Sequence, residues 1–210
     1  MIPKTQVPSR YSLLDFGFMD YEQCWTIQKE LVKQRFENSI PDTVILVEHP
    51  HVYTVGVRGQ QTVNVQRSNI PTYYVERGGG ITYHGPGQLV CYLIFNLEKL
   101  DLNVREFVEK ICNIIITSLS DFALKGVYNP KYPGVWINEK KIASIGLALN
   151  QGITYHGFAL NVNTELHFFK NINPCGLTGD VMTSMEKLVG EKVDMRDVKK
   201  SIIKWIYRIL

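Results

Sequence analysis

Chemistry in this sequence can come from a cysteine in a turn, a lysine at the start of a strand and histidines beside glycines. Cys175 lies in Asn173-Pro-Cys-Gly176, a turn-forming segment without an apolar face. Only a small fraction of a free thiol is thiolate at neutral pH, and a neighbouring cation raises that fraction. His84, His156 and a lysine are the candidate cations. Cys175 is therefore a candidate nucleophile, with Lys141 as a candidate partner.

Lys140 and Lys141 begin a predicted strand, so alternation should point their side chains to opposite faces of a sheet. One of the two lysines is expected to face a pocket together with Ala143 and Ile145. Small or smooth side chains of this kind would suit an alkyl chain. The other lysine is expected to face solvent.

The segment Arg77–Gln88 contains five glycines in twelve residues, and its pentapeptide Ile81–Gly85 recurs unchanged as Ile153–Gly157. A glycine-rich segment after a strand can bind phosphate, but this one lacks the terminal Gly-Lys-Ser/Thr of a P-loop and runs into an apolar strand. Two other interpretations stay open. The glycines can let a substrate chain approach while His84 and Gln88 orient its polar groups, or His84 can simply satisfy backbone carbonyls.

Hydrophobic periodicity predicts the elements that must position these residues. Asp20 with Gln23 and Asn103 with Glu106 are typical of helix N-termini, and a third, amphipathic helix is expected near the C-terminus. Strands are predicted over 43–47, 52–57, 73–76, 89–95, 135–137, 141–149 and 154–162, with turns at 48–51, 138–140 and 150–152. This order predicts one α+β domain over residues 1–210, with a mixed sheet flanked by helices.

Composition narrows the classes of function. A net charge of +3 with 20% charged residues and no dense Lys/Arg run does not favour nucleic acid as a partner. Apolar runs are shorter than the roughly 18 residues of a membrane span, and the N-terminus has no apolar signal core, so a cytoplasmic location is expected. Cys24, Cys91 and Cys112 have apolar neighbours and no zinc-ligand spacing, which predicts buried hydrophobic side chains and no metal site.

The motifs, taken in order, resemble the lipoyl(octanoyl) transferase family. The pattern R-G-G-x-x-T-x-H-G-P-G-Q is met in full by Arg77–Gln88, and Tyr92 follows where the family has tyrosine. Similar motifs are Glu48-His-Pro-His-Val-Tyr-Thr-Val-Gly56, Gly134-Val-Trp136, Lys141-Ile-Ala-Ser-Ile-Gly146, Thr154-Tyr-His-Gly-Phe-Ala-Leu-Asn161 and Ile172-Asn-Pro-Cys-Gly176. Val181-Met-Thr-Ser184 departs from the family's G-V-T-S at this place. The resemblance spans about residues 45–185.

The resemblance implies the fold of biotin protein ligase and lipoate ligase catalytic domains. It implies transfer of octanoyl from octanoyl-acyl carrier protein to the target lysine of lipoyl domains, in the E2 subunits of 2-oxoacid dehydrogenases and in the glycine cleavage H protein. Cys175 would form an acyl-enzyme thioester, and Lys141 would act as general acid and base. No cofactor is implied, since passing from thioester to amide is downhill without ATP. An acidic carrier protein would meet basic residues near the pocket mouth.

The resemblance also implies a set of substrate-binding residues drawn from these motifs. They are Arg77, Gly78, Gly79, Thr82, His84, Gly85, Gln88, Tyr92, Ser144, Ile145, Gly146, His156, Gly157 and Ala159. For Arg77, His84 and His156, a scaffolding role and direct substrate contact both stay open. Two other functions also stay open: an ATP-dependent lipoate or biotin ligase, and a non-catalytic acyl-binding protein on the same fold.

Overall fold

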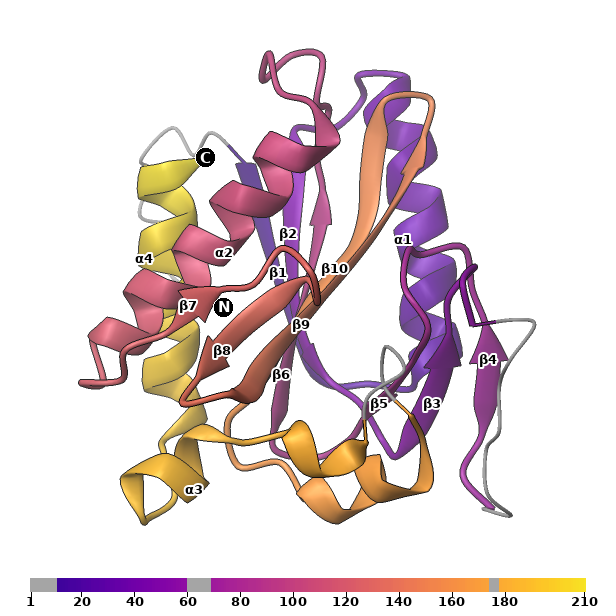
Figure 1. The fold of residues 1–210 in the computed structure, drawn as a ribbon. Helices are drawn as coiled ribbons and strands as arrows, with labels where there is room; N and C mark the ends of the chain where they lie inside the picture. Colours follow the sequence, from indigo (N-terminus) through magenta and orange to yellow (C-terminus); the bar gives the residue numbers. More distant parts are fainter. Residues whose placement is uncertain (1–10, 60–68, 174–177) are drawn as a thin grey trace.

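The computed structural model describes residues 11–59, 69–173 and 178–210, and a mixed seven-stranded sheet runs through it (Figure 1). The strand order is β1-β2-β6-β10-β9-β8-β7. The strands are β1 Tyr11–Phe18, β2 Asp42–Glu48, β6 Gln88–Ile94, β7 Val127–Tyr128, β8 Gly134–Ile137, β9 Lys140–Asn150 and β10 Ile153–Asn161. β1 and β2 are parallel, and every other neighbouring pair is antiparallel.

A smaller sheet has the order β4-β3-β5 and consists of β3 Val52–Val55, β4 Thr72–Tyr74 and β5 Ile81–His84. The sequence predicts a turn at 48–51 that joins two strands, but these two strands, β2 and β3, belong to different sheets. That turn therefore carries the chain from one sheet to the other. Four residues of the glycine-rich segment, Ile81–His84, are a strand and not a loop, because β5 pairs antiparallel with β3.

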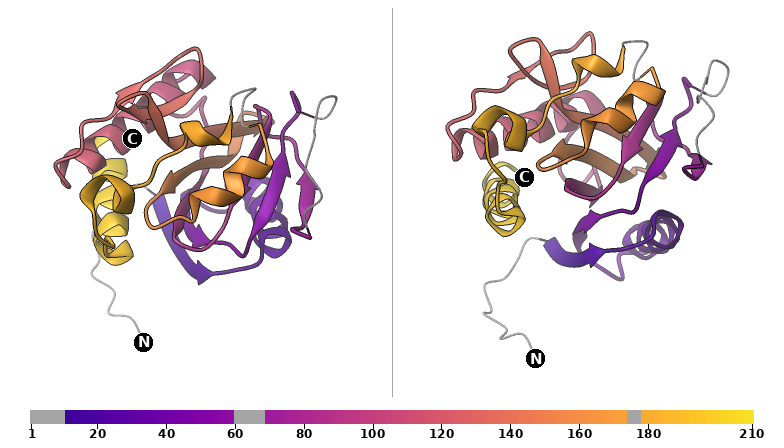
Figure 2. Two further views of the ribbon diagram at one scale, coloured as in Figure 1. Left: turned by 60° about the horizontal axis from the view of Figure 1, so that its bottom comes forward. Right: turned by 90° about the horizontal axis from the view of Figure 1, so that it is seen from below.

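Helices cover both faces of the large sheet, as Figures 1 and 2 show. Helix α1, Tyr21–Phe36, lies on one face with the small sheet, while α2, Val104–Ser120, and α4, Met195–Ile209, lie on the other. Short helices η1 Leu166–Asn171, η3 Gly179–Val181 and α3 Met185–Val189 connect β10 to α4. The expected mixed sheet flanked by helices is confirmed.

Capping groups fix the predicted helix starts. The Asp20 carboxylate accepts from the backbone N–H groups of Glu22 and Gln23 at the start of α1. Asn103 and Glu106 form a reciprocal capping box at the start of α2. At the other end of the chain, α4 follows the N-cap residue Asp194. The three predicted helices therefore start where short polar side chains satisfy their free N–H groups.

Alternation along the central strands divides the core in two. Leu89, Cys91 and Leu93 of β6 pack toward α2 and α4, whereas Val90 and Tyr92 pack toward α1. Cys24 and Cys112 are buried as predicted; Cys24 lies on the face toward α1, and Cys112 lies on the face toward α2 and α4. The face toward α1 also carries the pocket described below.

Both predicted hairpin turns are present. Asn138 and Glu139 between β8 and β9 have φ of 47° and 64°, and Gln151 and Gly152 between β9 and β10 have φ of 50° and 78°. Two consecutive left-handed residues are what a type I′ hairpin turn requires. The resulting β8-β9-β10 meander supplies one wall of the pocket.

Candidate active site

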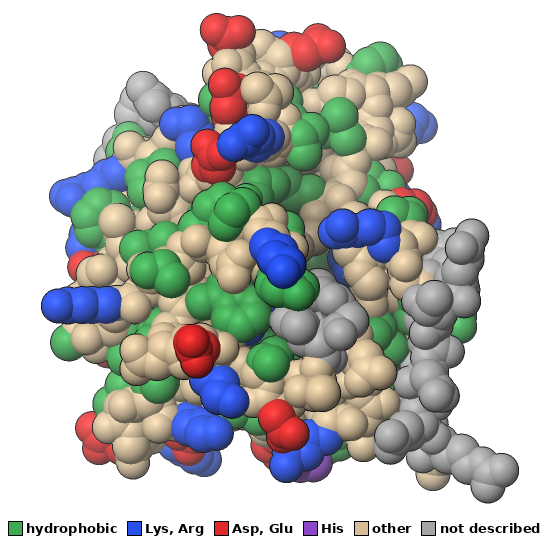
Figure 3. Space-filling view, viewed as in Figure 1, with side chains coloured by type: hydrophobic (Ala, Val, Ile, Leu, Met, Phe, Trp, Pro, Cys, Tyr) green, Lys and Arg blue, Asp and Glu red, His purple; other side chains and the backbone are tan. Residues whose placement is uncertain are grey.

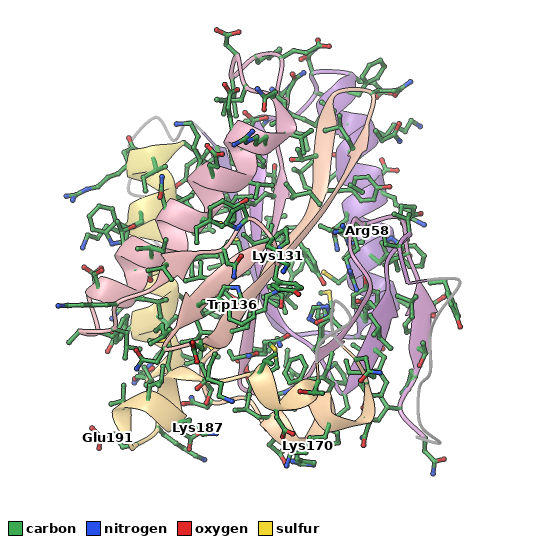
Figure 4. The ribbon with its side chains drawn as sticks, viewed as in Figure 1. Arg58, Lys131, Trp136, Lys170, Lys187 and Glu191 are labelled. Atoms are coloured by element: carbon green, nitrogen blue, oxygen red, sulfur yellow. The ribbon has the colours of Figure 1, made fainter. Side chains whose placement is uncertain are left out.

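A pocket lies between β9 and β10 of the large sheet and the segment 77–84 that leads into and forms β5. In Figure 3 the surface is hollowed between the side chains of Arg58 and Lys131, which Figure 4 labels. Among the described residues that line the pocket, Ile81, Val90 and Ile145 provide apolar surface. The pocket therefore offers apolar walls of the kind an alkyl chain needs.

The pocket brings together most of the residues that the sequence nominates. It is lined by Arg77, Gly79, Thr82, His84, Tyr92, Lys141, Ser144, Ile145, Gly146, His156, Gly157 and Ala159. Gly78, Gly85 and Gln88 are outside its lining. Cys175 lies outside the described residues, so the structure does not place the candidate nucleophile.

The three remaining predicted residues lie behind the pocket wall. Gln88 is buried and hydrogen-bonds to His84 Nδ1. The Gly78 N–H donates to the Leu147 carbonyl at 2.8 Å. A Cβ at Gly85 would overlap the hydroxyl of Tyr83, so only glycine fits there. These residues shape the site without contacting its interior.

The sequence misses five lining residues: Tyr21, Gly80, Ile81, Val90 and Phe158. Strand alternation would predict Val90, because it lies two residues from Tyr92 on a strand and so shares its face. No sequence pattern predicts Tyr21, which comes from α1 and stacks on His84 with ring centroids 6.0 Å apart. Only the fold brings the first turn of that helix to the glycine-rich segment.

Lys141 is buried at 3% exposure, and a β-bulge sets the direction of its side chain. β9 pairs Lys141 with Trp136 and Ala143 with Val135, which leaves Ile142 as an extra residue. The expectation that Ala143 shares the pocket face with Lys141 is wrong for this reason: Ala143 packs into the core against α2, and Ser144 lines the pocket instead. Ile145 lines the pocket as expected. Lys140 is exposed and donates to the Asp180 carbonyl at 2.9 Å.

Gly134 makes room for the Lys141 side chain. Its φ is 149°, and a Cβ there would lie 2.6 Å from Lys141 Cε and overlap the Ala143 carbonyl. The Lys141 Nζ lies 5.8 Å from the centroid of the Trp136 ring. The Lys141 carbonyl accepts from the Thr183 N–H at 2.9 Å. Gly134 and Trp136 therefore border the Lys141 side chain, and Thr183 holds its backbone.

A directed chain of hydrogen bonds holds His84. Gln88 Nε2 donates to Asn161 Oδ1 at 2.9 Å, so Gln88 Oε1 accepts from His84 Nδ1 at 2.7 Å. The neutral His84 ring then has a bare Nε2, which faces the Thr54 hydroxyl at 3.4 Å. Arg77 Nη2 donates to the same hydroxyl oxygen at 2.9 Å and to the Thr54 carbonyl at 2.6 Å.

The other end of this chain reaches the lysine strand. Asn161 Nδ2 donates to the Thr183 carbonyl at 2.9 Å, and Thr183 is the residue whose N–H is bonded to Lys141. Hydrogen bonds thus connect the buried groups from Arg77 to Lys141, and in each of these bonds the donor and the acceptor are defined. Such a network specifies one arrangement only when every member is satisfied.

His49 and Tyr92 close the pocket near α1. His49 Nδ1 donates to the Met19 carbonyl at 2.7 Å, so its Nε2 accepts from the Tyr92 hydroxyl at 2.8 Å. Burial lowers the pKa of His49 to about 4. Burial, together with the neighbouring His49, lowers the pKa of His84 to about 3. Both imidazoles are therefore neutral at neutral pH, as their hydrogen bonds require.

His156 has an unusual backbone for a strand residue. Its φ is 56°, which costs a non-glycine residue about 1–2 kcal/mol. Its N–H donates to Gln28 Oε1 of α1 at 2.9 Å. Gly157 follows, and a Cβ there would overlap the Cys91 carbonyl of β6. Burial is the main reason why the pKa of His156 is lowered.

Glu76 lies behind His156 at the edge of α1. Its Oε2 is 3.8 Å from His156 Nε2, beyond hydrogen-bond distance, and accepts from Trp25 Nε1 at 3.2 Å. Lys29 Nζ lies 3.4 Å from its other oxygen. The interaction with His156 is the largest cause that lowers the pKa of Glu76, and Lys29 adds to it. Partial burial acts in the opposite direction, and the pKa is about 2. Glu76 therefore presents a carboxylate to the imidazole.

Within residues 11–59, 69–173 and 178–210, no group of three or more His, Cys, Asp or Glu side chains is arranged to hold a metal ion. None of the helices in these ranges is long and apolar enough to cross a membrane.

Comparison with known proteins gives a consistent result. Residues 20–207 match the model of the lipoyl protein ligase A/B catalytic domain. The chain is 43% identical over 196 residues to an octanoyltransferase of Syntrophobacter fumaroxidans, covering 90% of this chain and 86% of that protein. The fold is similar to a putative lipoate protein ligase from T. acidophilum, with a TM-score of 0.74 at 15% identity over 95% of this chain and 85% of the other.

A more distant likeness joins the chain to biotin protein ligase from Aquifex aeolicus in complex with biotin and ATP. The TM-score is 0.56 at 13% identity, over 95% of this chain and 69% of that one. At this identity the likeness concerns the fold alone. The expected relation to biotin and lipoate ligase catalytic domains is thereby confirmed at the level of architecture.

Proposed function

The chain belongs to the lipoyl protein ligase A/B catalytic domain family, and from this premise we propose that it transfers octanoyl from octanoyl-acyl carrier protein to the target lysine of lipoyl domains. It is an acyltransferase of the octanoyltransferase type. The observation that carries the proposal is Lys141, a buried lysine in a pocket with apolar walls. Apolar walls of this kind suit an alkyl chain, and Lys141 lies among them.

The proposed first step uses Cys175 as the nucleophile. Its thiolate attacks the thioester carbonyl, the new C–S bond forms, and the carrier's sulfur leaves as a thiol with a proton from Lys141. Support for this pairing comes from described residues that follow Cys175 in the sequence. Met182 forms a parallel bridge with Lys141, and the Thr183 N–H donates to the Lys141 carbonyl.

The proposed second step passes the acyl group to an amine. The acceptor lysine has an unperturbed pKa near 10.4 and arrives protonated, so it must lose a proton before it attacks. In the proposal, neutral Lys141 takes that proton and the amine attacks the Cys175 thioester. The C–N bond forms, the C–S bond breaks, the Cys175 thiolate leaves, and the second proton of the nitrogen passes to solvent. Passing from thioester to amide is downhill, so the proposal needs no ATP.

Acceptors in this proposal are the lipoyl domains of 2-oxoacid dehydrogenase E2 subunits and the glycine cleavage H protein. Support is limited to the relatives, which are named for octanoyl transfer and for lipoyl protein ligation. A cytoplasmic location stays a prediction of the sequence.

The test is an assay of octanoyl transfer from octanoyl-acyl carrier protein to a lipoyl domain, with and without ATP. We expect transfer without ATP, and an octanoyl adduct on the intact protein that is absent from Cys175→Ala. Strict dependence on ATP would instead identify a ligase. Absence of any adduct and of any transfer would identify a non-catalytic acyl-binding protein.

A further inference from the structure

His156 points to the wrong side of its strand for a regular β-residue. Its neighbours Phe158 and Leu160 pack toward α2 and α4, while Tyr155 and Ala159 pack toward α1. Alternation would place the His156 side chain with Phe158, yet its ring contacts those of Tyr92 and Tyr155 on the α1 face. The left-handed φ of 56° explains this reversal, because it turns the Cα–Cβ bond relative to a regular strand.

Local sequence alone does not produce this conformation. The same pentapeptide occurs at Ile81–Gly85, where His84 is not among the residues with positive φ. The two copies differ in what surrounds them. At the second copy, the His156 N–H meets the side-chain oxygen of Gln28.

Gln28 is suited to hold this conformation. It lies in the interior of α1 and is 0% exposed, so its amide cannot be satisfied by solvent. Its Oε1 takes the His156 N–H at 2.9 Å. On the other edge of β10, His156 keeps its pairing with Leu147 of β9. The distortion is therefore confined to the side that faces α1.

One ring nitrogen of His156 is turned away from the pocket. Its Nε2 is buried without a hydrogen-bond partner among the described residues, and the Glu76 carboxylate lies 3.8 Å from it. This carboxylate favours the tautomer with the proton on Nε2. The same proton cannot also be donated to a substrate, so His156 meets the pocket through the rest of its ring.

We propose that Gln28 is a positioning residue of the pocket: it holds His156 in the left-handed conformation, and the His156 ring, placed in this way in the pocket wall, contacts the bound acyl thioester. This inference rests on the proposed function, because it needs an acyl substrate. It assigns to α1 a part in the site that the motifs do not contain.

The experiment compares four variants by kcat, KM and thermal unfolding: His156→Gly, Gln28→Met, their double variant and Gln34→Met. Glycine tolerates the left-handed backbone without strain, so His156→Gly keeps the fold while removing the imidazole. We expect His156→Gly and Gln28→Met each to lower kcat/KM about ten-fold, because each change removes or displaces the contact between the imidazole and the substrate. The exposed Gln34 of the same helix is the control, and Gln34→Met should match the wild type.

The double variant tests whether Gln28 acts through His156. We expect it to be no slower than the slower single variant, because the second change removes an interaction that is already lost. Gln28→Glu keeps an accepting oxygen and should recover part of the activity lost in Gln28→Met. Wild-type kcat/KM in a folded His156→Gly variant would overturn the substrate contact. Effects that multiply in the double variant would overturn the coupling.

A spectroscopic arm needs no turnover and separates this inference from the proposed function. The imidazole NMR signals of His156, assigned by comparison with His156→Gly, should shift in Gln28→Met and stay unchanged in Gln34→Met. Unchanged signals in Gln28→Met would refute the positioning role even in an active enzyme. Absence of octanoyl transfer by the wild type would refute the proposed function instead, and the NMR comparison would still decide the positioning role.

Discussion

On one face of the seven-stranded sheet, β6 and β10 present Leu93 and Leu160 to helices α2 and α4; on the other face, the same strands present Tyr92 and His156 to a pocket. The first face needs only matching apolar volume. The second buries polar groups, and each of them must find a partner of the right polarity. The two faces should therefore respond differently to substitution, one in stability and the other in activity.

The largest difference is expected at Lys141. We predict that Lys141→Ala lowers kcat for octanoyl transfer by about 10²- to 10⁴-fold, the usual range for loss of a general acid–base group. The fold should persist, because alanine leaves no unpaired charge in the pocket. Steady-state assays and circular dichroism measure the two effects.

The neighbouring lysine supplies the control for that test. Lys140 begins the same strand but is exposed and bonds to the Asp180 carbonyl. Lys140→Ala should keep nearly full activity. Near wild-type kcat in a folded Lys141→Ala variant would contradict the acid–base role of Lys141.

The face toward α2 and α4 should show the opposite response. Ile111 of α2 is fully buried at 0% exposure, and Ile111→Ala should lower the free energy of unfolding by about 2–5 kcal/mol. Activity per folded molecule should stay unchanged, because this side chain is separated from the pocket by the sheet. Chemical denaturation measures the loss. Val104 of the same helix is 44% exposed, and Val104→Ala should change stability by no more than about 0.5 kcal/mol.

Substitution of Asn161 tests whether the buried hydrogen-bond network contributes to both stability and activity. Asn161→Leu keeps the volume but removes one of the two acceptors of Gln88 Nε2 and the donor to the Thr183 carbonyl. We expect a loss of about 1–3 kcal/mol in unfolding free energy. Because Thr183 is bonded to Lys141, kcat should fall as well. The exposed Asn113 of α2 is the matched control, and a stability loss without any change in kcat would show that the network only supports the fold.

The difference between the faces also explains what the sequence predicts. The apolar face follows from periodicity: Phe107, Ile111 and Ile115 recur at helical spacing in the sequence, and all three are buried. The central position of β6 follows from its continuous apolar run. These predictions rest on the hydrophobic pattern of many residues, so one irregular residue does not change them.

The pocket face depends on single irregularities, which periodicity cannot show. The bulge at Ile142 moves Ala143 into the core, and the left-handed His156 moves an imidazole into the pocket. Tyr21 and Gln28 join the site only because α1 packs on this face. The glycine-rich segment stands out in the sequence and its roles are implied by resemblance, whereas the partners that orient its side chains come from tertiary structure.

The smallest predicted effect is the dependence of stability on pH, which should come mainly from the pocket face. The pKa of His49 is lowered to about 4 and that of His84 to about 3, against about 6.5 in the unfolded chain. The unfolded chain therefore binds more protons as pH falls. The stabilisation is complete above pH of about 6.5 and is lost progressively toward pH of about 4 and below.

Between pH 7 and 6 the loss should be about 1–2 kcal/mol for these two residues together, measured by denaturation at each pH. The variant His49→Gln keeps a hydrogen-bonding side chain and removes one of the two titrations, so the slope of stability against pH should fall. His167 is exposed, with 62% of its side chain accessible, and His167→Gln should leave that slope unchanged. An equal slope in wild type and His49→Gln would place the acid sensitivity elsewhere, and the two faces would then differ in activity but not in their response to protons.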